Sequence, residues 1–127
     1  ARGPVAVCAR RLFECVEEQS EAAALRVLRK LLAPGSLVLL ELEVREEAPS
    51  PLGTPLHRHV EPSALARRWT TGSHFALESL EHDVADAVAR VTLRKRGALE
   101  RRWCERGLRL RRAAGRLRRR LSRGSLR

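Results

Sequence analysis

Apolar residues at the start of the chain recur with the spacing of one helical face. Their positions are Val5, Cys8, Leu12, Cys15 and Val16. Intervals of three and four residues are typical of an amphipathic helix, and charged residues fill most of the positions between them. Pro4 suits the first turn of such a helix, and the sequence Ala-Pro-Gly at 33–35 stops it. We therefore predict one long helix over residues 4–32, or two helices with a joint near Ser20.

The period changes to alternation at residues 37–45, where leucine and valine alternate with charged residues. This pattern predicts a strand with one buried face. A strand needs a ladder partner, and the candidates are residues 56–60, residues 91–96 or a strand from another chain. A helical continuation is the alternative interpretation of the same residues.

The next segment is rich in proline, and this composition predicts a loop over residues 46–62. A short helix over residues 64–69 follows, because Pro62 and the serine after it suit a helix start. The sequence Thr-Thr-Gly at 70–72 breaks this helix, and Ser73 is a suitable N-cap for another one.

A second helical pattern begins at His74. Its apolar positions are Leu77, Leu80, Val84, Ala87, Val88 and Val91. Acidic residues lie early in this segment and basic residues lie late, as the helix dipole favours, and Gly97 suits the position after its end. We expect Leu80, Val84 and Val88 to be buried against the helix of residues 4–32.

The rest of the chain predicts two more helical pieces, residues 98–106 and 108–121, separated by Gly107. The second piece has a narrow apolar stripe, formed by Leu110, Ala113, Ala114, Leu117 and Leu121. Together these patterns predict a mostly α fold: two long amphipathic helices with one short strand, a Pro-rich loop and an Arg-rich helical C-terminal extension. We divide the chain into a small helical body, residues 1–89, and a basic extension, residues 90–127.

Charge is distributed unevenly between these two parts. Residues 90–127 contain 16 Arg or Lys residues and two acids, a net charge of +14, whereas residues 1–89 have a net charge of −3. So positive a segment requires a polyanion or an acidic surface to offset its self-repulsion, and nucleic acid is the commonest polyanion. Nearly all of these cations are arginines, whose planar guanidinium pairs bidentately with phosphate. A solvated or disordered tail is the alternative interpretation.

We predict that the cations of the extension and one tryptophan bind nucleic acid. The candidates are Arg94, Lys95, Arg96, Arg101, Arg102, Trp103, Arg106, Arg109, Arg111, Arg112, Arg116, Arg118, Arg119, Arg120 and Arg123. The tripeptide Arg-Arg-Trp at 101–103, also present at 67–69, can stack a base while its arginines hold phosphates. Trp103 would alternatively anchor the extension on the body. No Asn or Gln occurs within residues 90–127 to contact adenine edges, so binding should tolerate changes in base sequence.

Motifs for catalysis or for metal binding are absent from the sequence. It has no serine nucleophile motif, no glycine-rich phosphate loop and no CxxC pair. The histidine pair His57 and His59 has no further ligand at a known metal spacing. Three cysteines do not form a disulfide framework, and we expect Cys8 and Cys15 to be buried as small hydrophobic residues. We predict no enzyme activity, no metal, no cofactor and no transmembrane span.

These observations favour a structural RNA-binding subunit of a large ribonucleoprotein, such as an organellar ribosome. Its partners would be RNA, most simply ribosomal RNA, and neighbouring protein subunits. The sequence contains no methionine, which fits a cleaved leader and a mitochondrial matrix location, and equally fits a fragment. The alternative is a non-catalytic protein-interaction subunit whose basic extension docks on an acidic protein or a lipid membrane surface. A DNA-binding helical module is a third interpretation, although no recognition-helix pattern is present.

Overall fold

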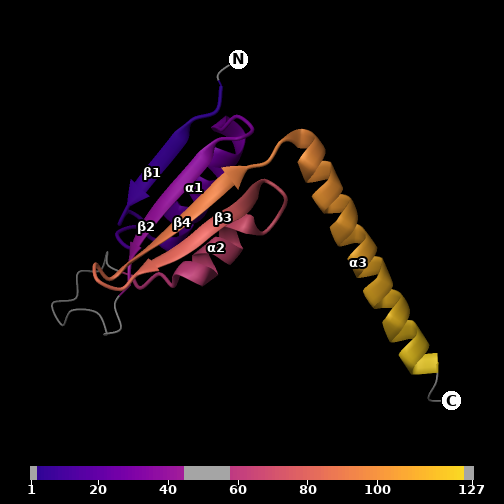
Figure 1. Ribbon diagram of the computed structural model, residues 1–127. Coiled ribbons are helices and arrows are strands. Elements are labelled where there is room, and N and C mark those ends of the chain that lie inside the picture. The colour runs from indigo at the N-terminus through magenta and orange to yellow at the C-terminus, as the bar shows by residue number, and fades with distance from the viewer. Residues whose placement is uncertain (1–2, 45–57, 125–127) are drawn as a thin grey trace.

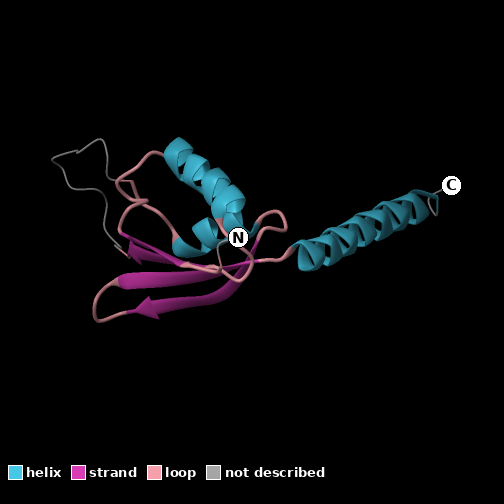
Figure 2. Ribbon diagram, turned by 90° about the horizontal axis from the view of Figure 1, so that it is seen from above, coloured by secondary structure: helices cyan, strands magenta, loops and turns pink. Residues whose placement is uncertain are grey.

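The computed structural model describes residues 3–44 and 58–124. Its elements, in chain order, are β1 (Ala6–Arg10), α1 (Glu18–Leu31), β2 (Leu37–Glu43), α2 (Pro62–Thr70), β3 (Phe75–Asp83), β4 (Val88–Lys95) and α3 (Ala98–Gly124). The strands form one mixed sheet in the order β1-β2-β4-β3, in which β1 and β2 are parallel and the other neighbours antiparallel. Helices α1 and α2 cover one face of this sheet, and α3 projects from the body after β4 (Figure 1; Figure 2).

The hydrophobic core lies between the sheet and the two helices that cover it. Alternate residues of β2 point into this core and are buried, namely Val38, Leu40 and Leu42. Trp69 of α2 is buried with them, and its ring centroid lies 5.3 Å from that of Phe13 and 6.3 Å from that of Phe75. These aromatic contacts hold α2 between the segment before α1 and the start of β3.

A buried carboxylate links α1 to α2. Glu21 of α1 is 3% exposed and accepts hydrogen bonds from Trp69 Nε1 at 3.1 Å, from Arg68 Nε at 3.1 Å and from Arg58 Nη2. Burial by itself raises the pKa of Glu21, but the hydrogen bonds from Arg58, Trp69 and Arg68 and the charge of Arg68 outweigh burial and lower the pKa. The body therefore neutralises its central charge with its own side chains.

The prediction of a helix over residues 4–32 is wrong in its first half. Residues 6–10 form β1, which pairs with β2 and points Val7 and Ala9 toward the core, and α1 covers only the second half of the predicted range. Four small apolar residues in a row, 6–9, are compatible with either a helix or a strand, and the parallel ladder with β2 decides between them. Cys8 and Cys15 are consequently exposed rather than buried.

The prediction of a second long helix from His74 is also wrong, because this segment is the β3–β4 hairpin. Leu80 and Val91 shared a predicted helical face, and in the hairpin they lie opposite each other on adjacent strands. Of the three residues expected in a helical seam, Val88 is buried and Leu80 packs against the core, whereas Val84 lies at the hairpin turn and is 91% exposed. β-Branched residues favour the hairpin over a helix once the ladder with β2 is available.

The strand prediction for residues 37–45 is confirmed by β2, and one of its three candidate partners, residues 91–96, lies in β4, which pairs with it. The short helix is confirmed as α2, and the side chain of Glu61 caps its start by accepting from two backbone N–H groups. The predicted loop of residues 46–62 lies mostly outside the described residues. The fold class is therefore corrected from mostly α with one short strand to a four-stranded mixed sheet with three helices.

Candidate nucleic-acid interface

Helix α3 is a continuous element of 27 residues, about 40 Å long at 1.5 Å per residue. The break expected at Gly107 does not occur, since the helix runs through this glycine and Gly115. The body holds only its start: Ser73 Oγ donates to Glu105 Oε1 at 2.8 Å, and Arg94 Nη2 donates to Glu100 Oε1 at 2.9 Å. Ser73 was expected to cap a helix, and instead its hydrogen bond to Glu105 links α3 to the body. Most of α3 extends away from the sheet (Figure 1).

Most of the predicted nucleic-acid ligands lie on α3 and are exposed. These are Arg102, Arg106, Arg109, Arg111, Arg112, Arg116, Arg118, Arg119, Arg120 and Arg123. None of them forms an ion pair with any residue that the structure describes. The helix carries 11 arginines and two glutamates, so its net charge is +9. Ten exposed guanidinium groups without an acidic partner leave a large positive field along α3.

Three further predicted ligands, Arg94, Lys95 and Arg101, lie near the point where β4 meets α3 and are engaged within the protein, and Arg96 beside them lies 3.7 Å from Glu100. Arg94 donates to Glu78 at 2.7 Å as well as to Glu100, and these hydrogen bonds raise the pKa of Arg94. Lys95 is 6% exposed, and its Nζ donates to the carbonyl of Arg29 near the end of α1. Arg101 lies 4.0 Å from Glu105, one helical turn away. These side chains position α3 on the body, and the arginines beyond them are available to a partner.

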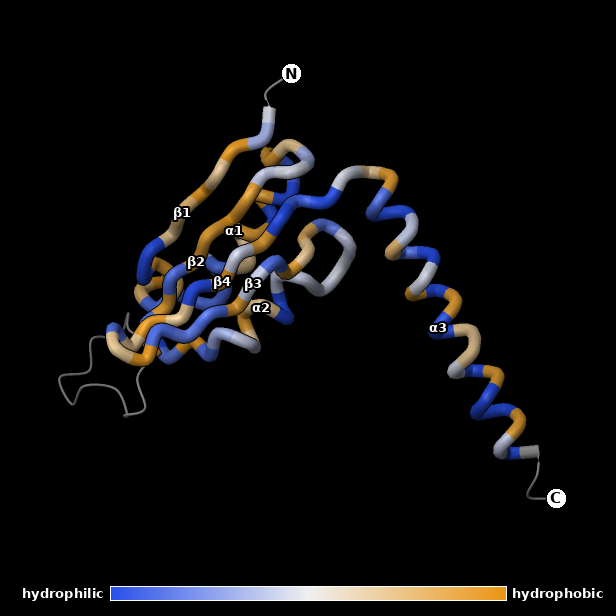
Figure 3. The backbone as a smooth tube through the Cα atoms, in the orientation of Figure 1, coloured by the Kyte–Doolittle hydropathy of each residue, from blue (hydrophilic) through white to orange (hydrophobic). Residues whose placement is uncertain are grey.

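An apolar stripe also runs along α3. Leu99, Trp103, Leu110, Leu117 and Leu121 follow one another at intervals of four or seven residues, which place them on one face. All five are exposed, and Figure 3 shows hydrophobic positions at intervals among the hydrophilic ones. Trp103 is 66% exposed and has Arg106 6.0 Å above its ring, so it does not anchor α3 on the body. The stripe is a second surface of α3 that a partner can cover.

The uncovered face of the sheet differs from α3, because its arginines are paired. Glu41 on β2 accepts from Arg10 at 3.3 Å and pairs with Arg90 at 3.4 Å, and Arg90 also lies 3.5 Å from Asp83. A chain of alternating charges across the strands has little attraction for a polyanion. The candidate interface is therefore α3 and not the sheet.

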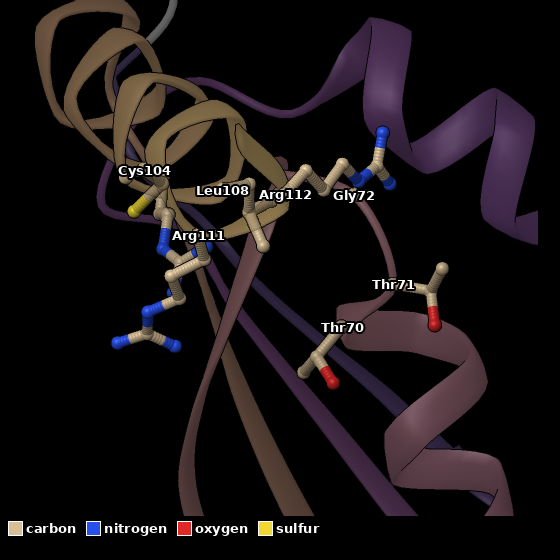
Figure 4. Close-up of a pocket in the computed structure, with 9 residues that line it drawn as sticks. Thr70, Thr71, Gly72, Cys104, Leu108, Arg111 and Arg112 are labelled. Atoms are coloured by element: carbon tan, nitrogen blue, oxygen red, sulfur yellow. The ribbon is translucent and has the colours of Figure 1, made fainter. Parts of the chain in front are cut away.

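A cleft separates α3 from the turn that follows α2. It has a volume of about 560 Å³, and its walls come from the segment 70–72 and from one side of α3 (Figure 4). Sequence patterns did not indicate this site, since its two walls are more than 30 residues apart in the chain. The positive φ of Gly72, +88°, is the one local feature that marks the turn, and a glycine before a predicted N-cap is too common to identify a site.

Other kinds of site find no support in the described part of the chain. Within residues 3–44 and 58–124, no group of three or more His, Cys, Asp or Glu residues is arranged to hold a metal ion. His57, one of the two histidines considered as metal ligands, lies outside the described residues. None of the described helices is long and apolar enough to cross a membrane.

Comparison with known proteins gives no family to which the chain can be assigned. A scan against known protein families finds no match. A search of curated proteins finds no similar sequence. A functional hypothesis therefore depends on the geometry and charge of α3.

Proposed function

We propose that this protein is a structural RNA-binding subunit of a large ribonucleoprotein. The observation that carries the proposal is the set of ten exposed arginines on α3 without an acidic partner among the described residues. Guanidinium groups distributed over most of a helix contact phosphates on more than one side, which suits an RNA that folds around an extension. The body, which pairs several of its charges internally, would dock on neighbouring protein subunits. A ribosome, including an organellar one, is an assembly of this kind.

The apolar stripe of α3 favours a second candidate function, in which the protein is an interaction subunit that binds an acidic protein or lipid surface. Phosphates do not cover the leucines at positions 110, 117 and 121, whereas an apolar groove or an acyl-chain boundary does. In a ribonucleoprotein the two surfaces of α3 have separate partners, with RNA on the arginines and a protein on the stripe. The RNA proposal therefore accommodates both observations.

A salt titration of RNA binding tests the proposal. If about six to eight arginines contact phosphates, the logarithm of the affinity for a single-stranded RNA falls with the logarithm of salt concentration at a slope of about −4 to −6. Changing Arg116, Arg119 and Arg120 to Gln in the full chain removes three exposed cations from α3 and should make the slope shallower by up to about 2.

The matched control changes Arg26, Lys30 and Arg67, three exposed cations of α1 and α2, to Gln. This variant has the same loss of charge and should keep the slope of the unmodified protein. Equal effects of the two triple changes would show that net charge attracts RNA without a site on α3. A slope near −1 for the unmodified protein would exclude RNA as the partner of α3 and leave the interaction-subunit function.

A further inference from the structure

The cleft between α3 and the segment 70–72 is lined by cations and contains no acid. Arg111 and Arg112 of α3 and Arg96 after β4 contribute to its walls, and none of the residues that line it is Asp or Glu. Figure 4 shows Leu108 pointing toward Thr70 between the two arginines of α3, which extend on opposite sides of it. The cleft thus has an apolar floor with guanidinium groups at its rim.

Two guanidinium groups at this end of the body have buried N–H groups without a partner. Arg96 Nε lies 3.7 Å from Glu100 Oε1, which is beyond hydrogen-bonding distance, and no described residue accepts from it. Arg29 Nε is likewise buried without an acceptor among the described residues, while Nη2 of the same side chain donates to Thr71 O at 3.0 Å. Arg29 therefore fixes the turn that forms one wall of the cleft.

Positive charge is also in excess at the end of the sheet where α3 begins. Burial lowers the pKa of Lys95 first, and the nearby charges of Arg101 and Arg29 lower it further. Burial and the charges of Arg101, Lys95 and Arg29 lower the pKa of His74 in the same way, with only Glu105 opposing them. An anion bound at this end of the sheet would relieve this repulsion between cations.

The geometry points to a nucleotide-sized site in this cleft that holds the sugar–phosphate backbone of the bound RNA, with phosphate oxygens on Arg96, Arg111 and Arg112. This inference rests on the proposed function and specifies where the RNA is fixed relative to the body. A volume of about 560 Å³ accommodates a nucleotide unit, and the apolar floor suits a ribose or a base face. The arginines beyond the cleft continue along α3, so one strand can pass from the cleft onto the helix.

The sequence of α3 provides a matched test in the full-length chain. Arg111 and Arg112 line the cleft. Arg118 and Arg119 lie seven residues later on the same side of α3, and they do not line the cleft. The double change R111Q/R112Q and the double change R118Q/R119Q remove equal charge from equivalent helix faces. Fluorescence anisotropy with a labelled 12-nucleotide single-stranded RNA compares their affinities at one salt concentration. We expect R111Q/R112Q to weaken binding about tenfold more than R118Q/R119Q.

Cys104 provides a second readout, because it is one of the residues that line the cleft. In a C8S/C15S background Cys104 is the remaining cysteine, and its alkylation rate should fall severalfold when the same RNA is bound. A C8S/C104S variant reports Cys15, which does not line the cleft and should react at an unchanged rate. The thiol readout does not depend on the stability of an arginine variant.

The outcomes separate this inference from the proposed function. Equal losses in the two double variants, with no protection of Cys104, would overturn the cleft site while RNA binding by α3 stands. No RNA binding by the unmodified chain would overturn the proposed function and the cleft site with it. Protection of Cys104 by phosphatidylserine vesicles and not by RNA would overturn the inference in favour of a lipid surface.

Discussion

The tripeptide Arg-Arg-Trp occurs twice, at 67–69 in α2 and at 101–103 in α3, and the two copies have opposite environments. In α2, Trp69 is 0% exposed, and Arg68 and Trp69 both donate to the carboxylate of Glu21. In α3, Trp103 is 66% exposed, and Arg102 has no ion-pair partner among the described residues. The second arginine and the tryptophan are structural in α2, whereas in α3 the same two residues are exposed.

The difference extends to the two regions as a whole. The sheet and the two helices that cover it pair several of their arginines, so that Arg58 and Arg68 share Glu21 and Arg10 and Arg90 share Glu41. Helix α3 leaves ten of its 11 arginines and its apolar stripe exposed, and it contributes no residue to the buried core among the described residues. The body therefore buries a core of its own, whereas the apolar stripe of α3 is left uncovered by the described residues.

Substitutions of the two tryptophans should give the largest difference in the free energy of unfolding. Trp69→Ala should lower the free energy of unfolding by about 3–5 kcal/mol, because it leaves a large cavity in the core. Trp103→Ala should change it by less than about 0.5 kcal/mol, because the indole is exposed. Urea denaturation followed by far-ultraviolet circular dichroism measures both variants. Equal destabilisation would show that α3 packs against the body through Trp103 in solution.

Removing the charge of Glu21 should have the next largest effect. Glu21→Gln leaves Arg58 and Arg68 without their shared carboxylate and should lower the free energy of unfolding by about 3 kcal/mol at neutral pH. Glu18→Gln is the control, since this glutamate lies exposed on the same helix, and should cost no more than about 0.5 kcal/mol. Similar losses in the two variants would contradict a special role for the buried carboxylate.

The pH dependence of this difference follows from the pKa of Glu21. Because the folded protein lowers that pKa from the ordinary value of 4.5, the charged carboxylate stabilises the protein above this pH. The stabilisation is lost as pH falls through the lower pKa of the folded state. The difference in free energy of unfolding between the unmodified protein and Glu21→Gln should therefore be largest at pH 7 and should decrease below about pH 4.5. A difference that stays constant down to pH 3 would assign the loss to packing.

Two glycines give the smallest contrast. Gly115 lies inside α3 with no atom within 4 Å of an added Cβ, so Gly115→Ala should stabilise the helix by about 1 kcal/mol. Gly35 has a φ of +85°, so Gly35→Ala should destabilise the body by about 1 kcal/mol or more. Hydrogen exchange resolves the two effects, with slower exchange confined to α3 in the first variant. Slower exchange throughout the body would show that α3 and the body unfold together.

Several secondary-structure elements could be predicted from the sequence, because interactions between neighbouring residues are sufficient to form them. Alternation over residues 37–43 predicts β2 whatever its partner, and Pro62 marks the start of α2. The amphipathic pattern and the concentration of arginine predict basic helical structure near the C-terminus, which α3 confirms, although the predicted break at Gly107 is wrong. Each of these depends on periods, caps and charges that act over one or two turns.

Tertiary structure alone decided the rest of the fold. β1 is a strand because β2 offers it a parallel ladder, and Cys8 lies beside Leu39, far away in the sequence. The β3–β4 hairpin replaces a helix because β2 also pairs with β4, and the predicted helical spacing then matches residues that face each other across two strands. A ladder satisfies the backbone hydrogen bonds of both chains at once, so it outweighs a local helical preference that short apolar runs express only weakly.

The same physical reason applies to the candidate site. The sequence determined that arginines concentrate near the C-terminus, but Arg94 and Lys95 belong to the sheet and are engaged by Glu78, Glu100 and the end of α1. The cleft forms only where α3 passes the turn after α2. Charge is a property of composition, whereas pairing and concavity depend on which distant segments the sheet brings together.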